Sequence, residues 1–422
     1  METTGLVKSL NVLLIGYVWP ERTSSAAGLR DWNLVEAIVG AGWKLTYACA
    51  AQRNIFSDEL ERAGVEVVSI QVNHSDFDRW VSGLKPDLVV FDRFITEEQF
   101  GWRVFESSPD SIRVLDTQDL HFLRRAREHA LKEGKSLAEI AFCEFELRTE
   151  TALREVASIY RCDQTLVLSD FESRLLQDRF QIPKDLIYLS RFHYPEPDEV
   201  PEFHEREHFV VLGNFRHPPN ADGIRWLKSE IWPLIRKALP EVRVHIYGAY
   251  PPKEIMNLSD PNMGFHVLGP VKDQFQVLRK ARVNLAPLRF GAGIKGKIAD
   301  GWWSGTPVVT TVVGAEGMAE GLAWGGAIAA TAYEFAQLAV AFYQDQAQWQ
   351  QGQENGLKII RTLYNKRENA INLVRNWFFL KENGLAMRKK NFVGSLLWHH
   401  QHQSTKYFSR WIEEKNSKTK ML

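Results

Sequence analysis

The sequence predicts an α/β protein with two tandem doubly wound, Rossmann-like domains that face a cleft, followed by a helical C-terminal tail. Three observations lead to this prediction. The chain has 422 residues, which is more than one hydrophobic core usually organises. Short continuous apolar runs alternate with helical patterns, which is typical of parallel strands buried between two layers of helices. This alternation stops at a proline-rich acidic segment and then starts again.

The first predicted domain covers residues 1–192. Its first strand is the apolar run NVLLIGYVW at 11–19, and a loop of small residues, TSSAAG, follows at 23–28. Each later strand is again a short apolar run bounded by polar or glycine-containing segments. The further expected strands are 44–50, 65–72, 86–94, 112–118 and 164–169, and the expected helices are 29–40, 58–64 and the longer helical stretch 122–158.

Residues 193–208 are the predicted linker, because they combine three prolines with many acidic residues and little apolar content. The second predicted domain covers 209–360 and repeats the rhythm of the first. Ligands of such sheets bind at the carboxyl ends of the strands, so we expect the site there and between the domains. The expected strands are 209–215, 242–248, 265–269, 283–288 and 307–311, and the expected helices are 220–239, 272–281, 295–304 and 333–349.

The composition excludes several partners and locations. The net charge is zero, with 52 Lys and Arg against 52 Asp and Glu, so charge does not favour nucleic acid. The segment METTGLVKSLNVLLIGY lacks the pattern of a signal peptide, and no run of eighteen apolar residues occurs. Cys49, Cys143 and Cys162 are far apart and match no metal-binding spacing. We therefore expect a cytoplasmic protein with free thiols.

The tail, residues 361–422, is basic and aromatic, with 13 Lys and Arg against 4 Asp and Glu. Large aromatic residues at helical spacing usually belong to a core, whereas cations beside aromatics also suit an anionic membrane surface. Both interpretations stay open, and packing back across the first domain is preferred. On that interpretation Trp377 and Phe378 are buried. The expected exposed basic patch consists of Arg388, Lys389 and Lys390.

The clearest motif is RFGAGIKGKIADGWWSGTPVVTTVVGAEG at 289–317. Gly291, Gly293 and Gly296 spell G-x-G-x-x-G, and Glu316 follows at the distance of a ribose-binding acid in dinucleotide sites. That fingerprint belongs in the first strand–helix unit of its domain, whereas this segment follows the fourth or fifth strand. We therefore expect a phosphate ligand other than NAD.

Features of the same segment indicate a nucleoside diphosphate. Glycines allow backbone amides to approach a phosphate closely, and the helix that begins here directs its positive end at it. Lys295 and Lys297 add cations, and Asp300, about one turn into the helix, is suited to accept ribose hydroxyls. The loop GAEG, which contains Glu316, is expected beside the first loop.

These segments resemble glycosyltransferases of the GT-B fold, specifically family 4, also called group 1. The resemblance implies a retaining hexosyltransferase that needs no metal and no cofactor. Its donor is then a nucleoside-diphosphate sugar, and its acceptor is a glycan, a lipid or another molecule. The matching segments, in the order of the family, are VLDTQDLHFLRRAR at 114–127, YRCDQTLVLSDFESRLLQ at 160–177, VVLGNFRHPPNADGIRWL at 210–227 and GAGIKGKIADGWWSGTPVVTTVVGAEGM at 291–318.

The resemblance also implies which residues bind the donor. Arg216 matches the basic residue that neutralises the diphosphate. The family has two glutamates eight positions apart, where this chain has Ala292 and Asp300. Asp300 then keeps the ribose contact, and the carboxylate that contacts the sugar is missing. The expected donor residues are Gly213, Arg216, Gly291, Ala292, Gly293, Ile294, Lys295, Asp300 and Glu316.

In the first domain the family places a histidine near the reacting carbon, and this chain has Gln118 there. Gln118 can donate hydrogen bonds but cannot act as a base, so its neighbours Asp119 and His121 complete the expected catalytic group. Gly28 and Arg30 are the expected acceptor-side residues. No metal ligand is expected.

Two alternatives stay open. A nucleotide-sugar epimerase or hydrolase on the same fold would use carboxylates and a histidine near the sugar, which Asp119 and His121 could supply. A catalytically degenerate protein that only binds a nucleotide would fit the missing glutamate and the presence of Gln118 in the histidine position.

Overall fold

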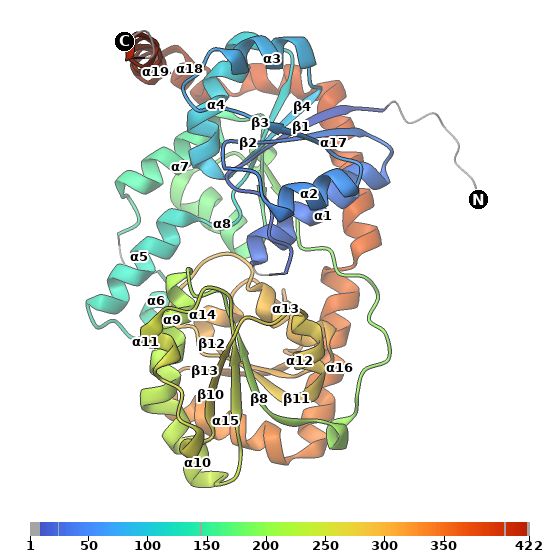
Figure 1. The fold of residues 1–422 in the computed structure, drawn as a ribbon, viewed down its shortest axis with the longest axis vertical. Coiled ribbons are helices and arrows are strands. Elements are labelled where there is room, and N and C mark those ends of the chain that lie inside the picture. Colours follow the sequence, from blue (N-terminus) through green and yellow to red (C-terminus); the bar gives the residue numbers. More distant parts are fainter. Residues whose placement is uncertain (1–8, 24, 144–145, 401, 420–422) are drawn as a thin grey trace, which may run out of the picture.

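The computed structural model describes residues 9–23, 25–143, 146–400 and 402–419. Two parallel sheets, one above the other in Figure 1, form the centres of two α/β domains. This confirms the predicted fold class of tandem doubly wound domains with a helical C-terminal region. The expected start of the first domain at residue 1 and the expected end of the tail at residue 422 lie outside the described residues.

The first sheet has seven parallel strands in the order β3-β2-β1-β4-β5-β6-β7. Leu13 and Ile15 of β1 pack into the core on one face, and Val12 and Leu14 pack into the core on the other. Because both faces are covered, the strand is a continuous apolar run. The strands are β1 (Asn11–Gly16), β2 (Lys44–Cys49), β3 (Glu66–Ser69), β4 (Leu88–Asp92), β5 (Ile112–Asp116), β6 (Gln164–Val167) and β7 (Ile187–Leu189).

Helices connect these strands and cover both faces of the sheet. Several begin after a residue whose side chain accepts a backbone N–H of the first turn, such as Ser25 before α1 and Ser169 before α8. The helices are α1 (Ala26–Gly40), α2 (Ile55–Arg62), α3 (Asp76–Leu84), α4 (Arg93–Ser107), α5 (His121–Lys132), α6 (Leu137–Ala141), α7 (Glu150–Arg161) and α8 (Asp170–Phe180).

The second sheet has six parallel strands in the order β10-β9-β8-β11-β12-β13. In both sheets the direction of chain progress reverses beside the first strand, between β1 and β4 and between β8 and β11. Ligands of doubly wound sheets bind at such switch points. The strands are β8 (Glu207–Leu212), β9 (Val244–Tyr247), β10 (Phe265–Gly269), β11 (Ala281–Ala286), β12 (Val308–Thr311) and β13 (Gly326–Ala329). The helices are α9 (Pro218–Trp226), α10 (Trp232–Ala238), α11 (Lys253–Met256), α12 (Gln274–Lys280), α13 (Gly296–Trp303), α14 (Val312–Ala315) and α15 (Ala332–Gln344).

The elements differ from the sequence prediction at several places. The helical stretch expected at 122–158 contains three helices, α5, α6 and α7. The prediction misses β7 and β13, because IYL and GAIA are very short and because the Gly and Ala of GAIA have a low strand propensity. The helix expected at 220–239 is α9 and α10 joined by a π-helical turn, Leu227–Ile231, just before Pro233, which cannot donate a backbone hydrogen bond. The helix expected at 333–349 is divided at Asp345, which caps α16 (Gln346–Leu363).

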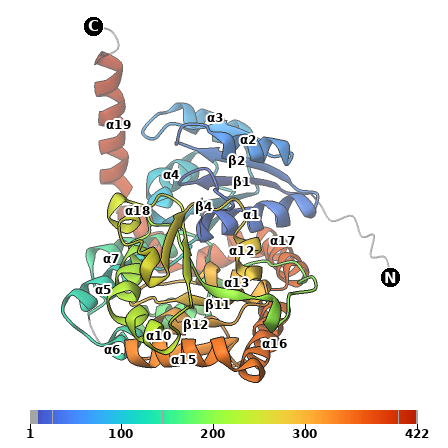
Figure 2. The ribbon, with the colours of Figure 1, turned by 60° about the horizontal axis from the view of Figure 1, so that its bottom comes forward.

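The chain then returns to the first domain through α17 (Lys366–Lys390). Leu373, Trp377 and Leu380 of α17 are buried in the core that also contains residues of α1. The expected burial of Trp377 is confirmed, and Phe378 is half-buried against the same core. The last helices are α18 (Phe392–His400) and α19 (His402–Thr419), and Figure 2 shows α19 projecting from the body of the molecule.

The expected basic patch is wrong at Arg388. Its guanidinium donates to both carboxylate oxygens of Asp163, each at 2.7 Å, and to two backbone carbonyls of the first domain. Arg388 is therefore half-buried and fastens α17 to the first domain, whereas Lys389 and Lys390 are exposed. Within the described ranges, no helix is long and apolar enough to cross a membrane.

Candidate active site

Two loops from the carboxyl ends of the two sheets meet at the domain interface (Figure 1). The glycine-rich loop 287–295 follows β11, and the turn 117–120 follows β5. A methyl group on Gly293, whose φ is +66°, would lie 2.8 Å from Cβ of Asp119 and 3.1 Å from the carbonyl oxygen of Gln118. A glycine is therefore needed for this close approach of the two domains.

Lys295 ends this loop and is the N-cap residue of α13. It is 7% exposed, and its ammonium has no hydrogen-bond partner among the described residues. Burial lowers the pKa of Lys295, while the carboxylates of Glu316 and Glu172 oppose that shift. The unpaired cation and the positive end of the α13 dipole together favour an anion at the domain interface.

Glu172, in the first turn of α8, links the two loops. Its Oε1 accepts the backbone N–H of Gly293 at 3.0 Å and that of Leu120 at 3.2 Å, one from each domain. Burial raises the pKa of Glu172 to about 7, and the charge of Asp119 acts in the same direction. This carboxyl group occupies a loop amide that the sequence analysis assigned to phosphate, so a phosphate there has to displace it.

Glu316 contacts the first domain. Arg127 of α5 is fully buried, and its guanidinium binds both carboxylate oxygens of Glu316, with an Nη1–Oε1 distance of 2.8 Å. The same nitrogen donates to the carbonyl oxygen of Gly291 at 2.8 Å. Burial alone would lower the pKa of Arg127, but the Glu316 carboxylate raises it above its ordinary value. Here Glu316 joins the domains, whereas the sequence analysis placed it among the donor contacts.

Asp119 and His121 lie side by side at the start of α5. Oδ1 of Asp119 is 3.3 Å from Nε2 of His121, and Arg124 donates to its Oδ2 at 2.7 Å. Burial alone would raise the pKa of Asp119, but the charges of Arg124 and His121 outweigh it and hold the pKa below its ordinary value. Burial lowers the pKa of His121 to about 4. At neutral pH the pair is therefore an ionised carboxylate and a neutral imidazole.

Gln118 follows β5 with a left-handed backbone, φ +62°. Its side-chain amide donates to Oδ1 of Asp31 at 2.7 Å, so the side chain points into the first domain. Burial raises the pKa of Asp31 well above its ordinary value, and the charge of Asp92 at the end of β4 adds to the shift. A buried acid cluster of Asp31, Asp92 and Asp116 thus lies behind the expected catalytic group.

The two expected acceptor-side residues have packing roles. A methyl group on Gly28 would lie 2.3 Å from the carbonyl oxygen of Glu21, so this helix turn requires glycine. Arg30 is fully buried, and each guanidinium nitrogen donates within the first domain: to Asp116 at 3.0 Å, to Oγ of Ser190 at 2.9 Å and to a backbone carbonyl. Arg30 therefore has a packing role in place of the expected contact with the acceptor.

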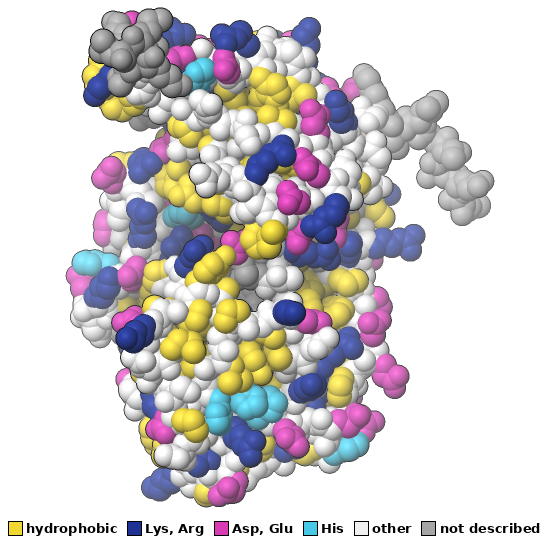
Figure 3. Space-filling view, in the orientation of Figure 1, with side chains coloured by type: hydrophobic (Ala, Val, Ile, Leu, Met, Phe, Trp, Pro, Cys, Tyr) yellow, Lys and Arg dark blue, Asp and Glu magenta, His cyan; other side chains and the backbone are white. Residues whose placement is uncertain are grey.

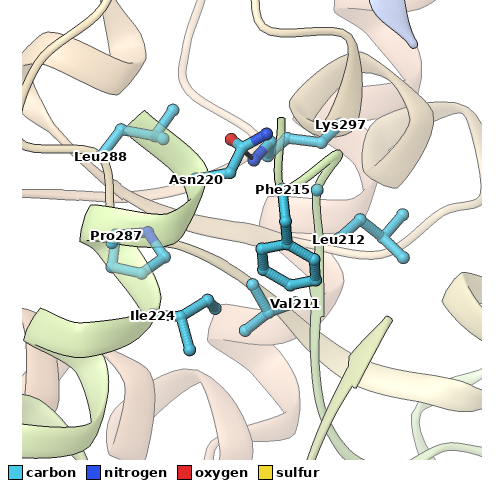
Figure 4. Close-up of a pocket in the computed structure, with 10 residues that line it drawn as sticks. Val211, Leu212, Phe215, Asn220, Ile224, Pro287, Leu288 and Lys297 are labelled. Atoms are coloured by element: carbon cyan, nitrogen blue, oxygen red, sulfur yellow. Dashed lines mark hydrogen bonds between the residues drawn. The ribbon is translucent and has the colours of Figure 1, made fainter. Parts of the chain in front are cut away.

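Gly213 follows β8 and lies beside Asn220. Figure 4 shows Asn220 and Lys297 directed toward each other, and the Lys297 ammonium donates to Oδ1 of Asn220 at 2.5 Å. These residues and β8 enclose a space of about 10 Å³, which holds about one water molecule. Burial lowers the pKa of Lys297 to about 7. Lys297 thus contacts Asn220 within the second domain, while Lys295 faces the other domain.

Arg216 lies in the exposed loop between β8 and α9. Its guanidinium is 3.5 Å from the centre of the Tyr250 ring. The Tyr250 hydroxyl in turn donates to the Glu21 carboxylate of the first domain at 3.0 Å. Arg216 is therefore held at the edge of the domain interface, where its charge is accessible to an anion.

Ala292 and Asp300, which stand at the positions of the family's two glutamates, both pack inside the protein. Ala292 packs against the core of the first domain. Asp300 is buried, and the hydroxyl of Tyr194 in the interdomain segment donates to its Oδ1 at 2.6 Å. Burial raises the pKa of Asp300 to about 7. Ile294 of the same loop is buried in the core beneath α13.

Sequence reasoning missed Glu172, Arg127 and Asp31. Glu172 comes three residues after Ser169, and such spacing usually predicts only the capping of a helix. Arg127 is one of several basic residues on α5, and Asp31 lies inside α1. Only the tertiary fold distinguishes them from surface charges.

The thiols and the acidic groups of the structure give no metal site. Cys49, Cys143 and Cys162 are buried and free. In the part of the chain that the structure describes, no group of three or more His, Cys, Asp and Glu side chains could hold a metal ion.

Two facing Rossmann-like domains, with a glycine-rich loop and the positive end of a helix at their interface, are the architecture of a GT-B glycosyltransferase. The family comparison agrees with this class: residues 206–345, from β8 to α15, match the family model described as Glycosyl transferases group 1. Residues 206–345 are therefore similar to a group 1 glycosyl transferase domain. A search of curated proteins found no match.

Solved glycosyltransferases have the same fold over most of this chain. Sucrose-phosphate synthase from Thermosynechococcus elongatus aligns with a TM-score of 0.67 and 15% identity over 87% of this chain and 98% of that chain. Anabaena HepE, solved with UDP and glucose, has a TM-score of 0.65 and 12% identity over 87% and 99%. The pneumococcal O-GlcNAc transferase GtfA, solved with UDP and GlcNAc, has a TM-score of 0.65 and 11% identity over 90% and 99%.

Proposed function

We propose that this chain is a retaining, metal-independent glycosyltransferase that moves a hexose from a nucleoside-diphosphate sugar to an acceptor hydroxyl. The observation that supports this most directly is the buried, unpaired ammonium of Lys295 at the start of α13. A diphosphate would pair with this cation, and Arg216 at the edge of the interface would add a second charge. Protein cations of this kind can neutralise a leaving diphosphate.

In the proposed reaction, the bond between the anomeric carbon and the diphosphate oxygen breaks while the acceptor oxygen attacks from the same face. The acceptor's proton passes to the departing diphosphate oxygen. Lys295, Arg216 and the α13 terminus stabilise the diphosphate. Asp119 and neutral His121 orient the reacting hydroxyls from the first domain. Glu172 brings a carboxyl group to the loop where the family's first glutamate is replaced by Ala292.

Donor binding in this proposal requires the domains to move. Gly293 packs directly on Asp119, and its amide is bound by Glu172. A diphosphate at Lys295 therefore needs the loop and the turn after β5 to separate. UDP is the first nucleotide to test, because two of the solved proteins of this fold contain it.

Titration calorimetry with nucleoside diphosphates tests the proposed donor site. We expect Lys295→Ala and Arg216→Ala each to weaken UDP binding by about 1.5–3 kcal/mol, because each removes a charge-assisted contact. Lys253→Ala, on the exposed start of α11, is the matched control and should bind UDP like the wild type. Binding of NAD without binding of any nucleoside diphosphate contradicts the proposal.

The Asp119–His121 pair keeps a nucleotide-sugar hydrolase as the second candidate, because these groups could activate water. Turnover of UDP-glucose with and without a panel of sugar acceptors separates the two. A rate that depends on the acceptor supports transfer. An equal rate without any acceptor supports hydrolysis, and binding without turnover supports a degenerate protein.

A further inference from the structure

A second cavity lies far from the donor site, between the first domain and the C-terminal helices. Its volume is about 450 Å³. It opens beside the amino ends of β5 and β6, whereas the candidate catalytic residues follow the carboxyl end of β5. Its wall includes Phe105 of α4, Arg113 of β5, Arg161 of α7, and Arg388 and Trp398 of the C-terminal helices.

Specific contacts hold α18 in place as one wall of this cavity. The side-chain amide of Asn391 donates to the carbonyl oxygen of Tyr160 at 2.7 Å, and the Trp398 indole donates to that of Arg161 at 3.0 Å. A methyl group on Gly394 would lie 2.3 Å from the same Tyr160 oxygen. The cavity is therefore bounded by a fixed interface.

The cavity contains a cation without a full partner. Arg113 is 2% exposed, and its Nε and Nη1 have no hydrogen-bond partner among the described residues. Its nearest carboxylate, Asp163, is 3.7 Å away and is bound through both oxygens by Arg388. The third arginine, Arg161, is paired with Glu97. Three guanidinium groups thus share two carboxylates, so this group of residues has one positive charge in excess.

Aromatic rings fix the position of this cation. The rings of Phe105 and Trp398 are stacked with their centres 4.4 Å apart. The Arg113 guanidinium lies 5.1 Å from the first ring centre and 4.8 Å from the second. Burial lowers the pKa of Arg113, and the nearby charge of Arg388 acts in the same direction, whereas Asp163 opposes it. An anion that enters the cavity would relieve this unpaired charge.

The surface next to the mouth of the cavity is apolar and basic. Ser395 and His399 line the cavity and are exposed on α18. Phe392 and Leu396 lie one helical turn from these two residues and are 74% and 49% exposed. Lys389 and Lys390 are exposed at the end of α17. Figure 3 shows basic, acidic and hydrophobic side chains on the visible face of the first domain.

We propose that this cavity binds the phosphate headgroup of an anionic phospholipid. Arg113 contacts the phosphate, and Phe392 and Leu396 enter the acyl region beside it. Phosphate is the shared chemistry of a lipid and a soluble phosphate ester, and the exposed apolar surface next to the mouth favours the lipid, because a soluble ester would leave that surface in water. This proposal does not depend on the transfer reaction, since the cavity and the donor site share no residue.

Vesicle flotation tests the proposal with the full chain. We expect retention on phosphatidylcholine vesicles that contain phosphatidylglycerol and no retention on phosphatidylcholine alone. Ser395→Glu places a negative charge at the mouth of the cavity and should weaken retention about tenfold, and the double change Phe392→Ala, Leu396→Ala should weaken it by a similar factor. Ile55→Ala on α2, 65% exposed, is the matched apolar control and should be retained like the wild type.

Three results would overturn the proposal. One is equal retention of Ser395→Glu and wild type, provided that both have the same melting temperature. Another is retention on neutral vesicles equal to that on anionic ones. The third is stabilisation by glycerol 1-phosphate without any retention on vesicles, which would identify a site for a soluble phosphate ester.

Discussion

Glu172 is the residue through which pH should act on the proposed donor site. Its carboxyl group lies on the Gly293 amide, and burial raises its pKa from the ordinary 4.5 to about 7. Above that pKa the carboxylate repels a diphosphate, and below it the neutral group does not. We therefore expect Glu172 to raise UDP affinity as the pH falls from about 8 to about 6, and Glu172→Gln to remove this contribution.

The comparison of Glu172→Gln with the wild type isolates this effect, because UDP itself also titrates. Protonation of UDP acts equally on both proteins, so only the difference between their affinity curves reports on Glu172. The raised pKa also has a consequence for stability. The folded protein binds more protons than the unfolded chain between about pH 4.5 and pH 7, so this group lowers the stability as the pH rises through that window. Parallel curves for the two proteins would contradict the prediction.

At the scale of elements, the glycine-rich loop requires a glycine at position 293 for two reasons. The residue has a φ of +66°, and its Cα faces Asp119 across the domain interface. We expect Gly293→Ala to lower turnover, because its methyl group cannot fit at 2.8 Å from the Asp119 side chain and therefore keeps the loop and the turn after β5 from closing together. Binding, turnover and melting temperature are measured together.

Gly321→Ala is the matched control for this change. Gly321 has a φ of +83°, and a methyl group there would meet no heavy atom within 4 Å. It therefore carries the backbone strain of a left-handed alanine, about 1 kcal/mol, without the steric clash. We expect both variants to melt below the wild type, Gly293→Ala at the lower temperature because the clash adds to the shared backbone strain, and only Gly293→Ala to lose activity. Equal activity of the two variants would contradict a role for the contact with Asp119.

The sequence predicts those elements whose environment can be inferred from their own residues. β1 and β4 are buried on both faces, so each is a continuous apolar run, whereas β13 is four residues, three of them Gly or Ala, that form a strand only because β12 lies beside it. The same holds for the site. The glycines and Lys295 follow from one segment, but Glu172 reaches Gly293 from the other domain. The tertiary fold also places Arg30, an expected acceptor-side residue, in a buried pair with Asp116.

At the scale of the whole molecule, ion pairs and two chain crossings join the domains. Arg127 binds Glu316, and Arg191 binds Glu320, each across the interface. The two crossings lie side by side: the backbone N–H of Tyr194 donates to the carbonyl of Tyr364 at 2.7 Å, and that of Lys366 donates back to Tyr194 at 2.8 Å. Paired crossings of this kind form a natural hinge, while the Arg127–Glu316 pair favours the closed arrangement.

The last prediction concerns this closure. Glu316→Gln leaves the Arg127 guanidinium buried without its charge partner, which costs about 3–5 kcal/mol for a buried pair. Opening of the domains relieves that cost, so X-ray scattering should give a larger radius of gyration for Glu316→Gln than for the wild type. UDP should reduce the difference, because donor binding in our proposal separates the domains of the wild type as well. Glu98→Gln is the matched control, because Glu98 pairs with Arg154 in an exposed contact within the first domain. Identical scattering of Glu316→Gln and the wild type, with and without UDP, would show that the ion pair does not hold the domains together.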